Sequence, residues 1–165
     1  GDVYKRQMVE NAVAIRDAGC TLDEAVTWLE AEKATNSIFF TVGNLDYLIK
    51  GGRIGKVSGR AANLLGIKPS LAVIDGELKV VKKYRGSLPI CVGKYITDLL
   101  DGRDDIDNCM VFISSCQPKP GCMEAIKAGL RRYGKFENII ETDIGTTIGG
   151  YSGPGTIGIV FAKKV

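Results

Sequence analysis

An Asp-Gly pair between two apolar runs is the feature that most restricts the folds open to this chain. In the stretch KPSLAVIDGELKVVKKY, residues 68–84, β-branched and apolar residues flank Asp75-Gly76 on both sides. A two-residue hairpin turn needs positive φ, which glycine adopts freely and aspartate tolerates. The sequence therefore predicts a β-hairpin here, and with it at least one antiparallel strand pair.

Hydrophobic periodicity predicts helices that alternate with strands along the rest of the chain. Together with the hairpin, this alternation favours an α+β fold in which helices pack on a mixed or mainly antiparallel sheet. Helices are expected at residues 8–18, from 21 onward, and at 45–50, 58–65, 87–100 and 121–132, and strands at 37–42, 109–115, 138–142 and 156–162.

The N-terminal part of the chain is predicted to be an aperiodic end followed by helices. Residues 1–7 show neither helical nor strand periodicity, and we interpret them as a cut or non-native end. The second helix begins with a capping box, in which Thr21 and Glu24 each bind the other's backbone N–H group. The buried stripe predicted for that helix consists of Ala25, Trp28 and Leu29.

Length and composition exclude several classes of function. The 165 residues carry a net charge of +3, with Lys and Arg interleaved with Asp and Glu, so no nucleic-acid-binding surface is expected. No apolar run approaches the roughly 18 residues that cross a bilayer, and residues 1–7 lack the apolar centre of a secretory signal. We therefore expect a single cytoplasmic domain without an integral membrane segment.

The absence of histidine removes much catalytic and metal chemistry. Ser-His-Asp and Cys-His nucleophiles need an imidazole base, and mixed zinc sites need an imidazole ligand. The five cysteines are odd in number and have no CxxC spacing, so mostly buried, reduced thiols are predicted rather than disulfides. No catalytic residue, metal or cofactor is predicted.

Two glycine-rich segments resemble nucleotide motifs and fail as such. The stretch GPGTIG, residues 153–158, fits the pattern GxGxxG, but only IVFAKKV follows it, which predicts a strand and not the required helix. In KGGRIGKVSGR, alignment with a P-loop puts Lys50 at the first glycine and Val57 at the metal-binding hydroxyl. Neither segment is expected to bind a nucleotide.

Each segment keeps two other interpretations. Gly51 and Gly52 end a helix and hold Arg53 on a turn, which is either a solvated basic turn or a site where the planar guanidinium binds an anion. The segment IGTTIGGYSGPGT, rich in glycine and hydroxyl groups, either exposes backbone N–H groups to an oxyanion or forms a sharp surface turn. The residues alone leave these alternatives open.

Taken together, these segments resemble the C-terminal domain of the DegV family of fatty-acid-binding proteins. The resemblance is carried by LDYLIKGGRIGK, GIKPSLAVIDGELKVVKKYRG and IGGYSGPGTIGIVF, in that order, and covers roughly residues 8–165. It implies an α+β domain at residues 36–165 that resembles the DegV C-terminal domain, preceded by a helical arm at 8–35 from the interdomain region. It also implies that the family's N-terminal domain is missing from this sequence.

The resemblance implies a protein that is not an enzyme. It would bind a long-chain fatty acid and present the carboxylate to a fatty acid kinase, which makes the acyl-phosphate used in bacterial phospholipid synthesis. Family members commonly carry histidine where this chain has Tyr151, which offers one phenolic donor instead. The ligand-binding residues implied are Gly52, Arg53, Tyr151, Ser152, Gly153, Pro154 and Gly155, and the kinase-docking residues are Lys68 and Arg85.

Two other functions stay open at this point. One is a structural or oligomerisation module that has lost ligand binding, which would make the chain a homo-oligomer. The other is a phosphotransfer domain like that of dihydroxyacetone kinase, which attaches its substrate through a histidine that this chain lacks.

Overall fold

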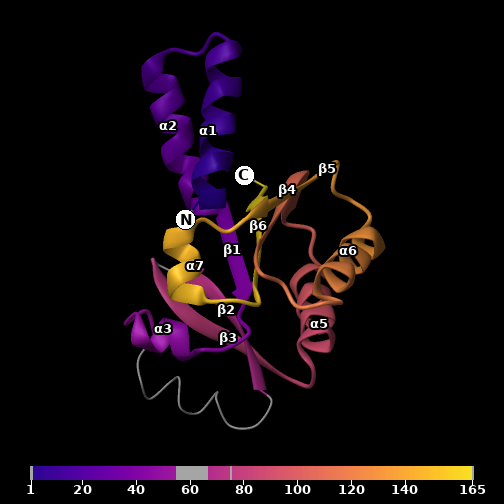
Figure 1. The fold of residues 1–165 in the computed structure, drawn as a ribbon. Helices are drawn as coiled ribbons and strands as arrows, with labels where there is room; N and C mark the ends of the chain where they lie inside the picture. Colours follow the sequence, from indigo (N-terminus) through magenta and orange to yellow (C-terminus); the bar gives the residue numbers. More distant parts are fainter. Residues whose placement is uncertain (1, 55–66, 75, 165) are drawn as a thin grey trace.

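A six-stranded mixed sheet organises the part of the chain that the computed structural model describes, residues 2–54, 67–74 and 76–164 (Figure 1). The strands lie in the order β3-β2-β1-β6-β4-β5. Neighbouring strands are antiparallel except β4 and β5, which are parallel. The predicted α+β class with a mainly antiparallel sheet is confirmed. The strands are β1 Asn36–Thr41, β2 Ile67–Ile74, β3 Glu77–Arg85, β4 Ile106–Cys116, β5 Asn138–Asp143 and β6 Thr156–Lys163.

The predicted hairpin is the β2–β3 pair. Ile74 pairs with Glu77 at its end, and Gly76 has a φ of 77°, the positive value that the turn requires. Asp75 and the helix predicted at residues 58–65 lie outside the described residues.

Helices flank the sheet on both faces (Figure 1). One helix, α7, was not predicted, because its threonines and glycines are poor helix formers. It forms in the terminal glycine-rich segment, where it packs against α3. The helices are α1 Asp2–Asp17, α2 Leu22–Thr35, α3 Asp46–Lys50, α5 Leu88–Leu100, α6 Cys122–Tyr133 and α7 Thr146–Ser152.

The two faces of the sheet carry different apolar clusters. Side chains alternate along β6, so that Ile157, Ile159 and Phe161 enter the main core together with residues of α5 and α6. On the opposite face, Phe112 and Val160 form one small cluster, and residues of α3 and β2 form another. The second face is therefore packed in two separate places, with the middle of the sheet between them.

The helices α1 and α2 form an arm that projects from one end of the sheet (Figure 1). The helix α1 begins at Asp2, so residues 2–7 are helical, although the sequence predicted no regular structure there. Two contacts account for this: Arg6 forms an i,i+4 ion pair with Glu10 (2.8 Å), and its guanidinium lies 5.9 Å from the Phe112 ring centre.

The capping box at the start of α2 is confirmed, but the burial predicted for Trp28 is wrong. Glu24 accepts a hydrogen bond from the Thr21 backbone N–H (2.8 Å), and Thr21 Oγ1 accepts one from the Glu24 N–H (3.4 Å). Trp28 is 43% exposed and Val9 is 61% exposed. Because the arm projects away from the sheet, its apolar side chains have little core to enter.

All five cysteines are free thiols, as predicted, but only two of them are buried, so the prediction of mostly buried thiols is wrong. Cys91 and Cys122 lie in the main core, whereas Cys20 is exposed in the turn between α1 and α2. Cys109 is exposed on β4. Apolar neighbours in sequence predicted burial at Cys109, but that part of β4 is uncovered.

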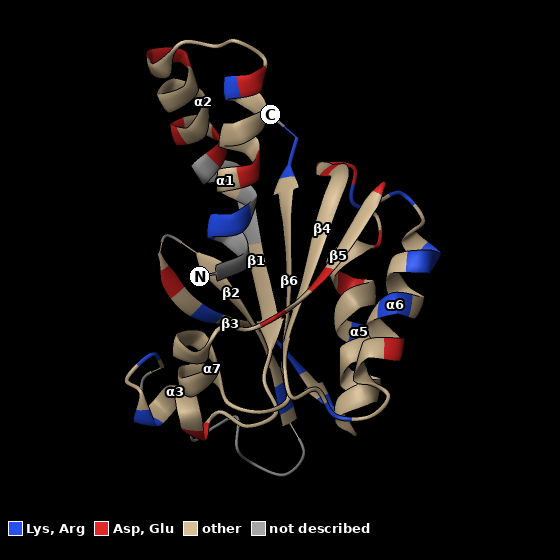
Figure 2. Ribbon diagram, turned by 45° about the horizontal axis from the view of Figure 1, so that its top comes forward, with Lys and Arg blue, Asp and Glu red and all other residues tan. Residues whose placement is uncertain are grey.

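Charged residues are distributed over the helices and strand ends, with both signs interspersed (Figure 2). Within the described residues, none of the helices combines the length and the apolar character needed to cross a membrane.

Candidate functional site

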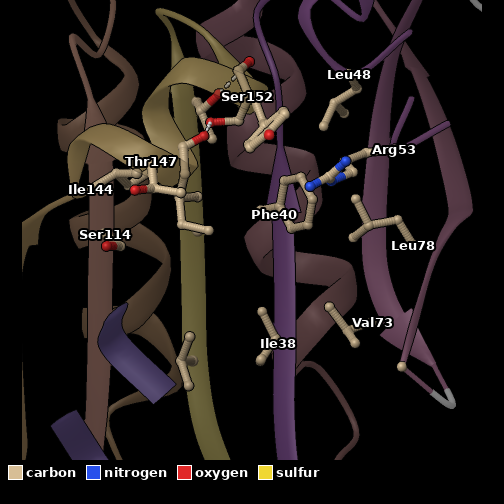
Figure 3. A pocket seen from close by; sticks show the side chains of 16 residues that line it. Ile38, Phe40, Leu48, Arg53, Val73, Leu78, Ser114, Ile144, Thr147 and Ser152 are labelled. Carbon is tan, nitrogen blue, oxygen red and sulfur yellow. Dashed lines mark hydrogen bonds between the residues drawn. The ribbon is translucent and has the colours of Figure 1, made fainter. Parts of the chain in front are cut away.

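A cavity of about 390 Å³ lies on the second face of the sheet, between the two small apolar clusters (Figure 3). Strands β1, β2, β3, β4 and β6 form its floor, and residues of α3 and α7 cover part of it. Most of its lining is apolar. The lining residues are Ile38, Phe40, Leu48, Arg53, Val73, Gly76, Leu78, Ser114, Ile144, Thr147, Ile148, Tyr151, Ser152, Thr156, Gly158 and Val160.

Gly158 lies in the middle of the cavity floor, where its lack of a side chain leaves space. It pairs with Phe40 on one side and with Ser114 on the other, so it lies in the centre of a row across the sheet. A Cβ atom at this position would meet only ordinary contacts, the nearest being 3.6 Å away. The missing side chain is thus not required by the backbone, and its absence leaves space above β6.

The two glycine-rich segments meet at one end of the cavity. The Arg53 guanidinium lies 4.1 Å from the centre of the Tyr151 ring, and its Nη1 donates a hydrogen bond to the Gly51 carbonyl oxygen (3.0 Å). A Cβ atom at Gly51 would overlap the same tyrosine ring. The turn after α3 and the helix α7 therefore fit together through a glycine, a tyrosine and a stacked arginine.

A second pair of close approaches fixes the Gly-Pro-Gly segment. Gly153 has a φ of 77° and a ψ of 175°, and a Cβ atom there would overlap the Tyr47 ring of α3. A Cβ atom at Gly43 would lie 2.8 Å from the Pro154 carbonyl oxygen. The Gly155 N–H donates a hydrogen bond to the Cys116 carbonyl oxygen (2.8 Å). Close packing therefore accounts for the missing side chains at Gly43 and Gly153, and the Gly155 N–H is bonded within the protein.

The structure brings some of the predicted residues to the cavity and leaves others away from it. Arg53, Tyr151 and Ser152 line it, and the Ser152 hydroxyl is already bonded to the Ile148 carbonyl oxygen (2.9 Å). The predicted glycines do not line it: Gly52 follows the end of α3 with a φ of 68°, Gly153 lies against Tyr47, and Gly155 lies against Gly43.

The residues predicted to dock the kinase lie elsewhere. Lys68 donates from Nζ to the Gly43 carbonyl oxygen (3.0 Å) and lines a second hollow of about 330 Å³ together with Lys119. Arg85 is exposed at the end of β3.

Three features of the site were missed by sequence reasoning. Gly43 was not singled out, because a single glycine directly after the strand predicted at residues 37–42 carries no distinctive signal. Thr147 was treated only as one hydroxyl among several in the terminal segment. Ser114 interrupts the apolar strand segment CMVFISSC, and that polar residue in a buried strand was the available signal.

The ionisable side chains with the clearest pKa shifts lie on the α5 side of the sheet. Burial, and then the hydrogen bond that its hydroxyl donates to Asp98 (2.9 Å), raise the pKa of Tyr84. The hydrogen bond from Lys82 is the main cause that lowers the pKa of Asp98. Among the described residues that line the cavity, Arg53 is the one charged side chain.

The described residues contain no group of three or more His, Cys, Asp or Glu side chains that could hold a metal ion. The chemistry that the lining offers is therefore an apolar surface, one guanidinium and several hydroxyl groups, which suits an apolar molecule with an anionic end.

A mixed sheet with helices on both faces and an apolar cavity under one helical layer defines the class of the protein as an α+β protein with an apolar pocket. A profile of the family described as "Uncharacterised protein, DegV family" matches residues 5–164. The chain belongs to the DegV family.

Relatives and solved structures agree with this assignment. The fatty acid-binding protein of Thermotoga maritima is 31% identical over 153 residues, which are 93% of this chain and 51% of that protein. A stearic acid-binding protein from Eubacterium ventriosum is 30% identical with a TM-score of 0.72, over 96% of this chain and 55% of that one. The chain thus spans about half the length of the relatives it matches.

A third similarity concerns the fold. The Fak B3 protein of the Streptococcus pneumoniae fatty acid kinase, crystallised with linoleic acid, has a TM-score of 0.82 over 96% of this chain and 55% of that one. Its sequence identity is 18%. At that level the likeness establishes the shared fold.

The Tyr47–Gly153 contact predicts that Gly153→Ala destabilises the protein more than Gly52→Ala. Both positions have positive φ, but no atom of the described residues lies within 4 Å of a Cβ atom at Gly52, whereas at Gly153 the new methyl group overlaps Tyr47. We expect the free energy of unfolding in urea to fall by about 1 kcal/mol for Gly52→Ala and by about 2–3 kcal/mol for Gly153→Ala. Equal losses would show that the tyrosine contact has no energetic role.

Proposed function

We propose that the cavity binds the acyl chain of a long-chain fatty acid. The observation that carries this proposal is an apolar floor formed by five strands that ends at the stacked pair Arg53 and Tyr151. Each methylene group removed from water contributes about 0.8 kcal/mol, so an extended apolar surface is sufficient for tight binding. Membership of the DegV family and relatives named as fatty acid- and stearic acid-binding proteins support the proposal.

The carboxylate of the ligand would be bound at the arginine end. A carboxylate left unpaired in an apolar site costs several kcal/mol, and charge-assisted hydrogen bonds from a guanidinium offset that cost. Stacking on the Tyr151 ring orients the planar fork of Arg53 in advance. The Tyr151 hydroxyl would replace the histidine that family members commonly carry there, with Gly52, Ser152, Gly153, Pro154 and Gly155 shaping the surrounding backbone.

The remaining part of this binding site would come from the N-terminal domain that full-length family members possess. The chain covers 51% of the Thermotoga maritima relative, and two apolar residues of the cavity lining, Val73 and Ile148, are exposed to solvent. The arm also exposes apolar side chains, among them Trp28. In this proposal the same domain covers both the cavity and the arm.

The partner that would receive the ligand is a fatty acid kinase, and this chain would present the carboxylate without catalysing a reaction itself. The similarity in fold to the Fak B3 protein of a fatty acid kinase supports this partner. Arg53 would act at the carboxylate, and Lys68 and Arg85 would contact the kinase. The location would be the cytoplasm, as predicted from the sequence.

Filling the floor of the cavity provides the most direct test of the proposal. Gly158→Val places two methyl groups in the space above β6, while its Cβ atom meets contacts of 3.6 Å or longer, and valine is favourable in a strand. We expect an at least tenfold weaker affinity for stearic acid, measured by titration with radiolabelled ligand, and an unchanged circular dichroism spectrum. Gly150→Ala is the matched control, since nothing lies within 4 Å of a Cβ atom there and Gly150 does not line the cavity. Unchanged affinity in the folded Gly158→Val variant would refute the proposed cavity.

Charge reversal at Arg53 tests the presentation of the carboxylate. Arg53→Glu places an anion beside the ligand's own anion, so fatty-acid-dependent ATP consumption by the kinase should fall at least tenfold. Arg131→Glu, an exposed arginine on α6 at the other face, is the matched control and should leave the rate unchanged. If both variants support equal rates, Arg53 has no part in ligand or kinase binding.

The fluorescence of Trp28, the single tryptophan of the chain, tests the covering of the arm. Acrylamide should quench it efficiently in the 165-residue chain and much less when the N-terminal domain of a DegV relative is added. Val13→Lys on the arm should prevent this protection, whereas Val81→Lys, at a similarly exposed valine on β3, should not. If protection of Trp28 from acrylamide depends only on the concentration of the chain itself, a second copy of the chain covers the arm. The protein would then be a homo-oligomer.

A further inference from the structure

One buried hydroxyl group in the cavity has no hydrogen-bond partner. Ser114 on β4 is 6% exposed, and among the described residues its Oγ atom has neither a partner nor contact with solvent. The other buried hydroxyls of the lining are bonded: Ser152 donates to the Ile148 carbonyl oxygen (2.9 Å), and Thr156 donates to the Gly153 carbonyl oxygen (2.8 Å). A buried hydroxyl without a partner is costly, so Ser114 differs from its neighbours in a way that packing does not explain.

The hydroxyl lies inside the apolar part of the cavity and away from its charged end. Ser114 pairs with Gly158, and Gly158 pairs with Phe40, so the three form one row across β4, β6 and β1. Gly158 and Ser114 both line the cavity, and since the Ser114 Oγ atom is closed to solvent in this conformation, its bond to a ligand would form after rotation of the side chain about χ1. Figure 3 shows Ser114 on one side of the cavity and Arg53 on the other, beyond Phe40. Two strand spacings, about 10 Å, separate the Ser114 and Phe40 backbones.

A serine hydroxyl can both donate and accept one hydrogen bond, so it suits a neutral oxygen on the ligand. A second charged group is excluded as its partner, because the only charged side chain of the described lining is Arg53, at the opposite side. The neutral oxygen would sit well along the acyl chain, since the carboxylate is bound at the arginine end.

We propose that the preferred ligand is a fatty acid with a hydroxyl or oxo group on its chain, and that Ser114 selects it by a hydrogen bond to that oxygen. This inference rests on the proposed binding of fatty acids and adds the class of acyl chain. Ser114 acts in it as a specificity-determining residue, and it has no role in binding the carboxylate.

The test compares stearic acid with a series of its monohydroxy derivatives, substituted at single positions along the chain. The measured quantity is the ratio of the affinity for each hydroxy acid to the affinity for stearic acid. For at least one positional isomer, we expect this ratio to be about fivefold higher in the wild type than in Ser114→Ala, a change typical of one neutral hydrogen bond. Ser114→Thr retains a hydroxyl and should keep the preference. Ser115→Ala is the matched control, because Ser115 is the next residue of β4, points to the opposite side of the sheet and is absent from the cavity lining.

Thermal unfolding of the empty protein gives an independent readout. Ser114→Ala removes a hydroxyl that has no partner, so its Tm should equal or exceed that of the wild type. A markedly lower Tm would mean that the hydroxyl is bonded within the protein or to a bound water, and would overturn the inference.

The binding outcomes separate the two proposals. If stearic acid binds but Ser114→Ala leaves the ratio of affinities unchanged for every isomer, selection by Ser114 is refuted and fatty-acid binding stands. If neither stearic acid nor any isomer binds, the proposed function fails, and this inference fails with it.

Discussion

The candidate site depends on the way two short helices are joined through glycine and tyrosine. Tyr151 of α7 occupies the space that a side chain at Gly51 would need, and Tyr47 of α3 does the same at Gly153. The contact is reciprocal, so neither helix can shift without displacing a ring of the other. Helices of five and seven residues are too short to be stable by themselves, and this packing holds them over the sheet. The position of Arg53 follows from it.

The fold can contain a cavity because its main apolar core lies on one face of the sheet and the cavity lies on the other. Alternation along β6 places Ile157, Ile159 and Phe161 in the main core, against α5 and α6. That core buries enough apolar surface to define the fold, so the other face need not be filled. There, Gly158 occupies the central position, and the two small clusters on either side leave the space above it open.

The sequence predicted the elements whose signals are local. The hairpin at residues 67–85, the capping box at Thr21 and the helices α5 and α6 follow from turn chemistry, caps and periodicity, which need no tertiary information. The helix α7 and the exposure of Trp28 could not be predicted in this way, because both depend on what packs against them. For the site, the resemblance to the DegV family indicated that the two glycine segments meet, whereas the importance of Gly43 and Ser114 became visible only when strand pairing placed them beside distant residues.

The polar groups around the cavity differ in what they leave for a ligand to satisfy. Ser152 and Thr156 donate to backbone carbonyl oxygens of α7 and of the segment that follows it, so their hydroxyls stabilise the protein itself. One N–H group of Arg53 donates a hydrogen bond to the Gly51 carbonyl oxygen, and its guanidinium carries four further N–H groups. If the cavity binds fatty acids as proposed, binding at this charged end would be strong without being selective, since every fatty acid has a carboxylate. In the proposed function, discrimination between acyl chains would then arise along the apolar floor. There, the unpaired hydroxyl of Ser114 would distinguish ligands more sharply than methylene contacts, because leaving a polar group unsatisfied costs more than losing one methylene.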